Sequence, residues 1–201
     1  MDLQGPAGGE VRGVIVFIGI GSNRGNPVGA CREAVRHLSE TPEVRLLRCS
    51  SLYRTEPVGP HDQPWFINAV AEIRTSLPPR RLFEALKEIE RRMGRTEGPK
   101  WGPRIIDLDL LLYGQEVVTE GGLNIPHPEL HRRRFVLVPL CELASYAIHP
   151  AFGVSVRGLL DRLTDPGRVE LYSPAVADAD NDGVISYRGT DICVTEGKND
   201  N

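Results

Sequence analysis

The central strand of the predicted sheet reads Lys100-Trp101-Gly102-Pro103-Arg104-Ile105-Ile106-Asp107-Leu108-Asp109-Leu110-Leu111-Leu112-Tyr113-Gly114. Gly102-Pro103 ends the preceding element, and the apolar, β-branched run that Gly114 closes is typical of a strand. Because side chains alternate across a strand, Asp107 and Asp109 project from the same face, with Cα atoms about 6.6 Å apart. The opposite, core-facing side carries Ile106, Leu108, Leu110 and Leu112.

Two neighbouring carboxylates on an apolar strand are unfavourable unless their charge is compensated, because like charges repel and burial strengthens the repulsion. Oxygen ligands with no softer donor nearby suit Mg²⁺, which retains several waters and completes its shell with substrate phosphates. Arg104 lies just upstream and offers a fork of donors that matches a phosphate group. The alternative is a solvent-exposed strand face on which Asp107 and Asp109 bind nothing.

The composition excludes several classes of function. The 201 residues predict one domain with tails, and a hydrophobic content of 40% supports a proper core. A net charge of −3 does not favour a general nucleic-acid binder, and there is no apolar run long enough to span a membrane. The first residues lack a secretory pattern, so we expect a cytoplasmic protein with reduced thiols. The four cysteines, which have no metal-binding spacing, are Cys31, Cys49, Cys141 and Cys193.

A glycine-rich turn follows the first predicted strand, Val14 to Ile20, and precedes a helix that Asn26 caps. Residues 1–13, before this strand, are expected to form a flexible tail. A dinucleotide site is one interpretation of the turn, but its glycines are one residue too widely spaced and no acidic residue follows the next strand. A tight turn that leads the chain into the helix is the better interpretation.

Two further strands are predicted, over Val44–Arg54 and Trp65–Arg74, with a proline-rich loop between them. Phe66 and Asn68 share one face of the second strand, at the edge of this stiff loop. An aromatic ring and an amide at that spacing could stack on a flat heterocycle and hydrogen-bond to it. The alternative places Phe66 in the core and pairs Asn68 with neighbouring backbone.

The second predicted helix begins near Ser76 and ends at Gly94. Its charged residues, Glu90 among them, are assigned mainly to a solvated face. The buried stripe consists of Leu82, Leu86, Ile89 and Met93.

Beyond residue 114 the pattern predicts a short edge strand over Gln115–Val118 and a helix over Val136–Leu143. Before that helix, His127 lies between two prolines and three arginines end at Phe135, an arrangement that could hold an anion.

The composition changes at Asp165, and from this residue onward the chain has eight acidic and three basic residues. Residues 178–183 fit the first places of a calcium loop, but the twelfth place is Gly189 where glutamate is needed. We therefore divide the chain into a catalytic domain over residues 14–165 and a mobile acidic extension over residues 166–201.

Four blocks of sequence together carry a family resemblance. They are Gly21-Ser22-Asn23, residues 51–63 with Phe66 and Asn68, residues 101–111, and Pro126-His127 with Arg133 to Phe135. In these blocks the chain resembles 6-hydroxymethyl-7,8-dihydropterin pyrophosphokinases. The resemblance covers roughly residues 14–165, and the third block is the most specific of the four.

The resemblance implies a ferredoxin-like α/β fold, that is, an antiparallel sheet covered by helices on both faces. It also implies transfer of pyrophosphate from ATP to the pterin hydroxymethyl group in folate biosynthesis, with AMP leaving, by a monomer that binds small molecules only. Two Mg²⁺ ions would be held by Asp107 and Asp109, and Asp109 is the candidate acceptor of the hydroxyl proton. Arg95 and Arg104 would stabilise phosphate charge.

The resemblance assigns the substrate contacts as well. The residues implied for the pterin are Thr55, Val58, Phe66, Asn68 and Phe135, with the two phenylalanines stacking on its two faces. Those implied for ATP are Glu90, Arg95, Trp101, Leu110, His127 and Arg133. The loop over residues 96–99 is one residue shorter than usual and carries Glu97 in place of basic residues.

Two other functions fit parts of the pattern. A non-catalytic ferredoxin-like module that binds a small ligand would need no paired aspartates beside Arg104. A Mg²⁺-dependent phosphohydrolase would use the same carboxylates but no aromatic pocket.

Overall fold

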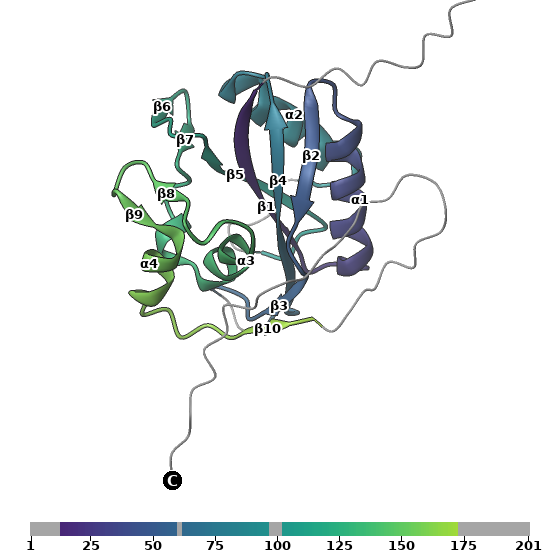
Figure 1. The fold of residues 1–201 in the computed structure, drawn as a ribbon. Coiled ribbons are helices and arrows are strands. Elements are labelled where there is room, and N and C mark those ends of the chain that lie inside the picture. The colour runs from purple at the N-terminus through teal and green to yellow at the C-terminus, as the bar shows by residue number, and fades with distance from the viewer. Residues whose placement is uncertain (1–12, 60–61, 97–101, 173–201) are drawn as a thin grey trace, which may run out of the picture.

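The computed structural model describes residues 13–59, 62–96 and 102–172. The predicted strand–helix–strand–strand–helix–strand order is present in the first part of the chain, except that the second predicted strand is divided in two, and a second helical layer follows (Figure 1). The strands are β1 (Val14–Ser22), β2 (Val44–Cys49), β3 (Tyr53–Thr55), β4 (Phe66–Thr75), β5 (Asp107–Tyr113), β6 (Val118–Glu120), β7 (Leu123–Ile125), β8 (Ile148–His149), β9 (Val154–Ser155) and β10 (Val169–Leu171). The helices are α1 (Pro27–Glu40), α2 (Pro79–Arg92), a 3₁₀ turn (Leu130–Arg132), α3 (Arg134–Ala144) and α4 (Val156–Asp161).

One antiparallel sheet organises the molecule. Its strand order is β10-β3-β4-β1-β5, and β2 pairs with the other end of β4. Helices α1 and α2 cover one face, and α3 with α4 covers the other, which gives three layers (Figure 1). Both faces of β1 and β4 are therefore buried, and the apolar residues of each face pack under a different pair of helices.

The alternation predicted for β5 holds at its start and breaks near its end. Leu108 and Leu110 pack under α1 and α2, opposite Asp107 and Asp109, as predicted. A bulge in the pairing with β1 then places Leu111 and Leu112 together on the α3 side. The prediction that Leu112 lies on the same side as Leu108 is therefore wrong, because the extra residue reverses the alternation from that point.

The single strand predicted over residues 44–54 is two strands. β2 pairs with residues 71–75 of β4, whereas β3 pairs with residues 66–68. Between them the buried Ser50 donates its N–H to the carbonyl of Val70, and its Oγ accepts the N–H of Val70 at 2.9 Å. A side chain thus replaces a backbone partner, which interrupts the ladder without leaving a buried donor unpaired.

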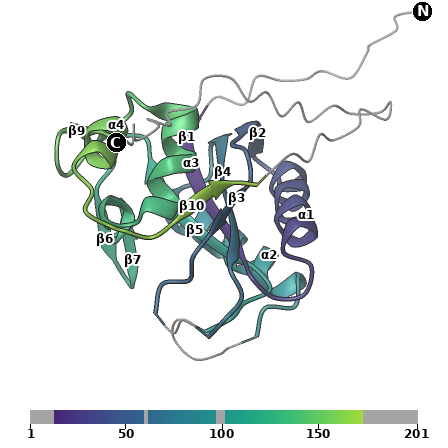
Figure 2. The same cartoon turned by 90° about the horizontal axis from the view of Figure 1, so that it is seen from below.

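Three boundaries in the structure differ from the predicted ones. The strand expected over residues 115–118 begins at Val118 and pairs with β7, and the last long helix begins at Arg134. The domain also continues past residue 165, because β10 joins the main sheet beside β3 (Figure 2). The flexible tail predicted for residues 1–13, apart from Gly13, and the calcium-like segment lie outside the described residues.

Two further predictions concern the cysteine thiols and membrane-spanning helices. Cys31, Cys49 and Cys141 are buried thiols, and burial raises the pKa of the Cys31 and Cys49 thiols to about 12. In the described part of the chain no helix is long and apolar enough to cross a membrane.

His149 packs in a small ring cluster beside α4. It is 3% exposed, it stacks on Phe152 with ring centroids 4.3 Å apart, and His131 lies edge-on at 6.5 Å. No group among the described residues hydrogen-bonds to its Nδ1. Burial, and secondarily the charge of His131, lowers the pKa of His149.

This lowered pKa predicts destabilisation by acid. As the pH falls below the ordinary imidazole value of about 6.5, the unfolded chain takes up a proton at residue 149 while the folded chain resists it. Stability is then lost until the pH reaches the lower, folded-state pKa. The variant His149→Phe keeps the stacked ring and is expected to show a smaller loss of unfolding free energy between pH 7.5 and pH 5.5, measured in urea. An unchanged loss would show that folding does not lower the pKa of His149.

Candidate active site

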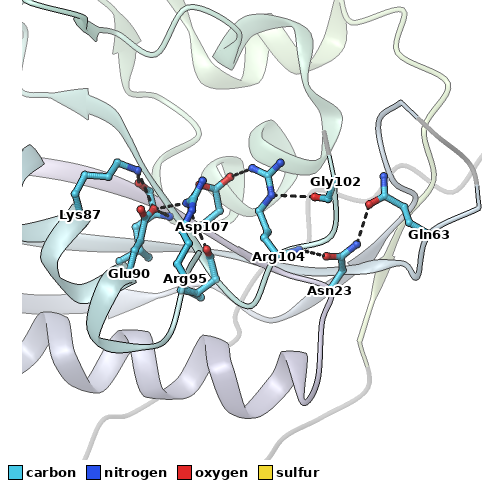
Figure 3. Close-up of polar contacts among 10 residues, drawn as sticks. Asn23, Gln63, Lys87, Glu90, Arg95, Gly102, Arg104 and Asp107 are labelled. Atoms are coloured by element: carbon cyan, nitrogen blue, oxygen red, sulfur yellow. Dashed lines mark hydrogen bonds and ion pairs between the residues drawn. The ribbon is translucent and has the colours of Figure 1, made fainter. Parts of the chain in front are cut away.

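A chain of charged side chains runs from α2 to the start of β5. The carboxylate of Asp107 accepts hydrogen bonds from both Arg95 and Arg104, one on each oxygen. Arg95 also donates to Glu90 at 2.6 Å, and Lys87 donates to the same Glu90 oxygen at 2.8 Å (Figure 3). Two anions and three cations are therefore held within one connected network at the end of α2.

Glu90 lies at the centre of this network and not on a solvated face, so the prediction of its exposure is wrong. It is 3% exposed, and its Oε1 also accepts the backbone N–H of Leu108 at 2.7 Å. Burial raises its pKa, although Lys87 and Arg95 oppose this effect. Glu90 thus connects helix α2, strand β5 and the guanidinium of Arg95 through a single carboxylate.

The environments of the two aspartates separate their pKa values. Burial would raise the pKa of Asp107, but the guanidinium groups of Arg104 and Arg95 outweigh burial and hold it below its usual range. Burial raises the pKa of Asp109, and the negative charge of Asp107 raises it further. The charges of the two aspartates also act on His127. Burial lowers the pKa of His127, although the negative charge of Asp109 opposes this effect. The excess negative charge at Asp109 would be relieved by a cation, and two half-buried oxygen ligands fit Mg²⁺.

An open cavity adjoins these carboxylates. Its polar end is formed by Arg104, Asp107 and Asp109. Its other walls come from β1, from the segment after β3, from the start of β4 and from the residues around the start of α3. Among the residues of these walls are Gly19, Gly21, Thr55, Glu56, Val58, Phe66, Asn68, Arg133 and Phe135.

The amide of Asn68 is fixed by its neighbours on the cavity floor. Its Nδ2 donates to Oγ1 of Thr55 at 2.7 Å, and both residues are buried. A Cβ at Gly21 would lie 2.7 Å from Oδ1 of Asn68, so only glycine leaves room for this amide. The alternative prediction, in which Asn68 bonds to neighbouring backbone, does not describe this contact. The cavity therefore combines a fixed amide, aromatic rings and a charged end.

Comparison with known proteins agrees with this geometry. The family model for 7,8-dihydro-6-hydroxymethylpterin-pyrophosphokinase (HPPK) matches residues 17–145. The chain is 42% identical over 137 residues to the 2-amino-4-hydroxy-6-hydroxymethyldihydropteridine pyrophosphokinase of Haemophilus influenzae, covering 68% of this chain and 86% of that protein. It is also 42% identical to the enzyme of the same name from Methylorubrum extorquens over 154 residues, which are 77% of this chain and 96% of that protein.

The chain belongs to the HPPK family.

Solved structures show the same fold. The Plasmodium falciparum HPPK-DHPS protein with pterin and p-hydroxybenzoate superposes with a TM-score of 0.61 at 16% identity, covering 75% of this chain and 43% of that one. The chain thus spans less than half of that longer protein. The predictions of the family, of its ferredoxin-like α/β fold and of a pyrophosphokinase activity are confirmed.

The structure brings most of the predicted HPPK site residues together. Nine line the cavity: Thr55, Val58, Phe66, Asn68, Arg104, Asp107, Asp109, Arg133 and Phe135. Arg95 reaches the site through Asp107, and His127 donates its backbone N–H to the carbonyl of Leu111. The side chain of Leu110 lies in the core under α2, on the opposite side of β5, so only its backbone could contact a nucleotide there. Trp101 and the shortened loop, beyond Thr96, lie outside the described residues.

Asn23 is a residue of the site whose role sequence reasoning missed. It is 2% exposed, its Oδ1 accepts the N–H of Arg104 at 2.8 Å, and its Nδ2 donates to Gln63 Oε1 and to the carbonyl of Pro64. It therefore joins the segment that carries Arg104 to the loop before β4 (Figure 3). The only signal was its place in the Gly21-Ser22-Asn23 block, since its partners are 40 or more residues away.

Proposed function

We propose that this chain transfers the pyrophosphoryl group of ATP to the hydroxymethyl oxygen of 6-hydroxymethyl-7,8-dihydropterin and releases AMP. The observation that carries the proposal is the single cavity that joins an amide and aromatic pocket to paired carboxylates and arginines. The pocket suits a flat heterocycle, and the charged end suits a triphosphate. The relatives' names give the substrate class, and the geometry of this chain agrees with it.

In this mechanism the pterin binds between Phe66 and Phe135, and Asn68 hydrogen-bonds to its polar edge. Val58 and Thr55 close the pocket, and Thr55 keeps the Asn68 amide in one orientation. The pterin hydroxymethyl group then extends toward the carboxylates of β5. Holding the hydroxyl oxygen beside the triphosphate replaces a collision of two molecules with a step inside one complex.

The triphosphate binds at the charged end of the cavity. Asp107 and Asp109 would hold two Mg²⁺ ions, whose positive charge would offset the charge of the triphosphate and of the departing AMP. Asp107 bonds to one nitrogen of each arginine, and a guanidinium carries five N–H donors, so Arg95 and Arg104 can also bind phosphate oxygens. Their positive charges stabilise the charge that develops in the transition state. Asp109, whose pKa is raised by burial, is the candidate acceptor for the hydroxyl proton.

The remaining nucleotide contacts come from both sides of β5. His127 and Arg133 extend from the segment before α3, and Glu90 orients Arg95 from α2. Trp101 is proposed to cover the bound nucleotide. We further propose that the enzyme acts as a monomer in the cytoplasm, on small molecules and without a nucleic-acid or membrane partner.

AMP release from ATP and Mg²⁺, measured with and without the pterin, tests the proposed function. AMP that forms only when the pterin is present supports it. ADP, or phosphate released without pterin, would instead identify a hydrolase or a different kinase. No turnover with pterin binding retained would identify a binding module.

Phe66→Ala extends this test to the pocket. Loss of the stacking ring is expected to weaken the affinity for pterin by about tenfold, which is roughly 1.4 kcal/mol, because the variant loses both burial and stacking. Trp65→Ala is the matched control, since Trp65 packs against Arg54 and is not among the cavity-lining residues. Equal effects of the two substitutions on pterin affinity would contradict the assignment of the pocket.

A further inference from the structure

The C-terminal strap, residues 165–172, contacts two walls of the cavity and connects them. It begins at Asp165 beside the start of α3 and ends in β10, which pairs with β3. Figure 2 shows β10 alongside β3 and close to α3, and both elements contact it. One wall, from β3, supplies Thr55 to the cavity, and the other supplies Phe135.

At its first end the strap holds the start of α3. Asp165 Oδ2 accepts the backbone N–H of Arg134 at 2.9 Å, and the carbonyl of Asp165 accepts Nε of the same arginine at 3.0 Å. Helix α3 begins at Arg134 and has no capping side chain at Arg133, so Asp165 satisfies a donor of its first turn. The neighbours of Arg134 in the chain, Arg133 and Phe135, both line the cavity. Asp165 therefore holds the backbone next to Phe135 and influences the position of that ring.

At its other end the strap holds the segment after β3. The N–H of Glu56 donates to the carbonyl of Arg168 at 3.2 Å, and the N–H of Arg168 donates to Glu56 Oε2 at 3.1 Å. Nε of Arg168 lies 3.3 Å from Glu56 Oε1. Glu56 lines the cavity, between Thr55 and Val58. Arg168 thus pairs with a carboxylate that belongs to the wall of the cavity.

We propose that the C-terminal strap positions the pterin pocket, with Asp165 and Arg168 as positioning residues that act through Arg134 and Glu56. This inference rests on the proposed function, because it concerns the pocket in which that function places the pterin. The strap sets the separation between the wall that carries Thr55 and the wall that carries Phe135. The paired carboxylates of the charged end do not belong to these walls, because Asp107 and Asp109 lie on β5, at the opposite edge of the sheet.

The expected effects are specific to one substrate. Arg168→Ala removes a partly exposed ion pair and is expected to weaken pterin affinity by up to about fivefold. Asp165→Ala removes a charge-assisted hydrogen bond to a helix N-terminus and is expected to weaken it by about tenfold. Arg168→Lys keeps a cation beside Glu56 and is expected to stay within about twofold of the wild type. The affinity for a non-hydrolysable ATP analogue should fall by much less than the affinity for pterin in each of these full-length variants, because Asp107 and Asp109 lie on the opposite edge of the sheet.

The test is calorimetric titration of pterin in the presence of the ATP analogue, and of the analogue alone, on each full-length variant. Arg157→Ala is the control, because it breaks an exposed ion pair with Asp161 within α4. A selective loss of pterin affinity in Arg168→Ala and Asp165→Ala supports the strap. Unchanged pterin affinity, or an equal loss for both ligands, overturns it.

The wild-type measurement separates the two proposals. If the wild type neither binds the pterin nor forms AMP with it, the proposed function fails, and the positioning role fails with it. If the wild type does both and the strap variants match it, only the positioning role fails. Thermal unfolding of each variant accompanies the titrations, and a variant that has lost its fold loses both affinities.

Discussion

Asp109→Asn is expected to lower pterin-dependent AMP formation by about a thousandfold, equivalent to roughly 4 kcal/mol of transition-state stabilisation. The substitution keeps the shape of the side chain and removes the charge that is proposed to hold a metal ion. Burial and the neighbouring Asp107 raise the pKa of Asp109, so its charge is unfavourable in the protein without a cation. The variant should therefore be as stable as the wild type or more stable, even though it is inactive.

This opposite response of activity and stability identifies a functional carboxylate. Substitution of a structural carboxylate would lower both the activity and the stability of the protein, whereas Asp109→Asn should lower the activity alone. The measurements are AMP formation at saturating substrates, its dependence on Mg²⁺ concentration, and the free energy of unfolding in urea without metal. Asp161→Asn, at an exposed carboxylate of α4, is the control and should leave both quantities unchanged. An Asp109→Asn variant with wild-type turnover at the same Mg²⁺ concentration would exclude the proposed metal role.

Glu90→Leu is expected to reduce the free energy of unfolding by about 3 kcal/mol, because removing one partner of a buried ion pair leaves the others uncompensated. Lys87, Arg95 and the buried N–H of Leu108 all lose the same acceptor. Arg95 would keep its bonds to Asp107 and to the carbonyl of Ile106 but lose its link to α2, so AMP formation should also fall, by about tenfold to a hundredfold. Urea unfolding and AMP release measure the two effects.

The same helix provides a matched comparison for Glu90. Glu84 is an exposed residue of α2 whose nearest cation, Arg80, lies 3.8 Å away. Glu84→Leu should change the free energy of unfolding by less than about 0.5 kcal/mol, in keeping with a surface ion pair. If the two variants were equally stable, the carboxylate of Glu90 would not be holding α2 against β5.

The local pattern of the sequence predicted the strand that carries the aspartates, because alternation is a property of neighbouring residues. It did so for Leu108 and Leu110 and failed at Leu112, where the bulge is set by pairing with β1. Glu90 shows a similar limit. Its spacing of four residues from Leu86 placed it next to the apolar stripe, but its partner N–H belongs to Leu108, 18 residues away. A hydrophobic pattern places a carboxylate beside an apolar stripe, but it does not identify the distant N–H groups from which that carboxylate accepts hydrogen bonds.

The residues of the cavity were predicted from resemblance more than from pattern. Phe66 and Asn68 were visible as an aromatic and an amide on one strand face, with two interpretations open. The contact of Asn68 with Thr55 favours the pocket, and it depends on the register between β3 and β4. The pairing of β10 with β3 depends likewise on distant residues, and the acidic composition after Asp165 concealed it.

The β6–β7 hairpin forms a two-stranded sheet of its own beside the central one. Its turn, at Gly121 and Gly122, has positive φ at both residues and is exposed to solvent. A segment added there would extend outward without displacing a strand of the main sheet. This hairpin is therefore a place where the enzyme could accept a fluorescent reporter or an affinity tag while keeping its catalytic cavity intact.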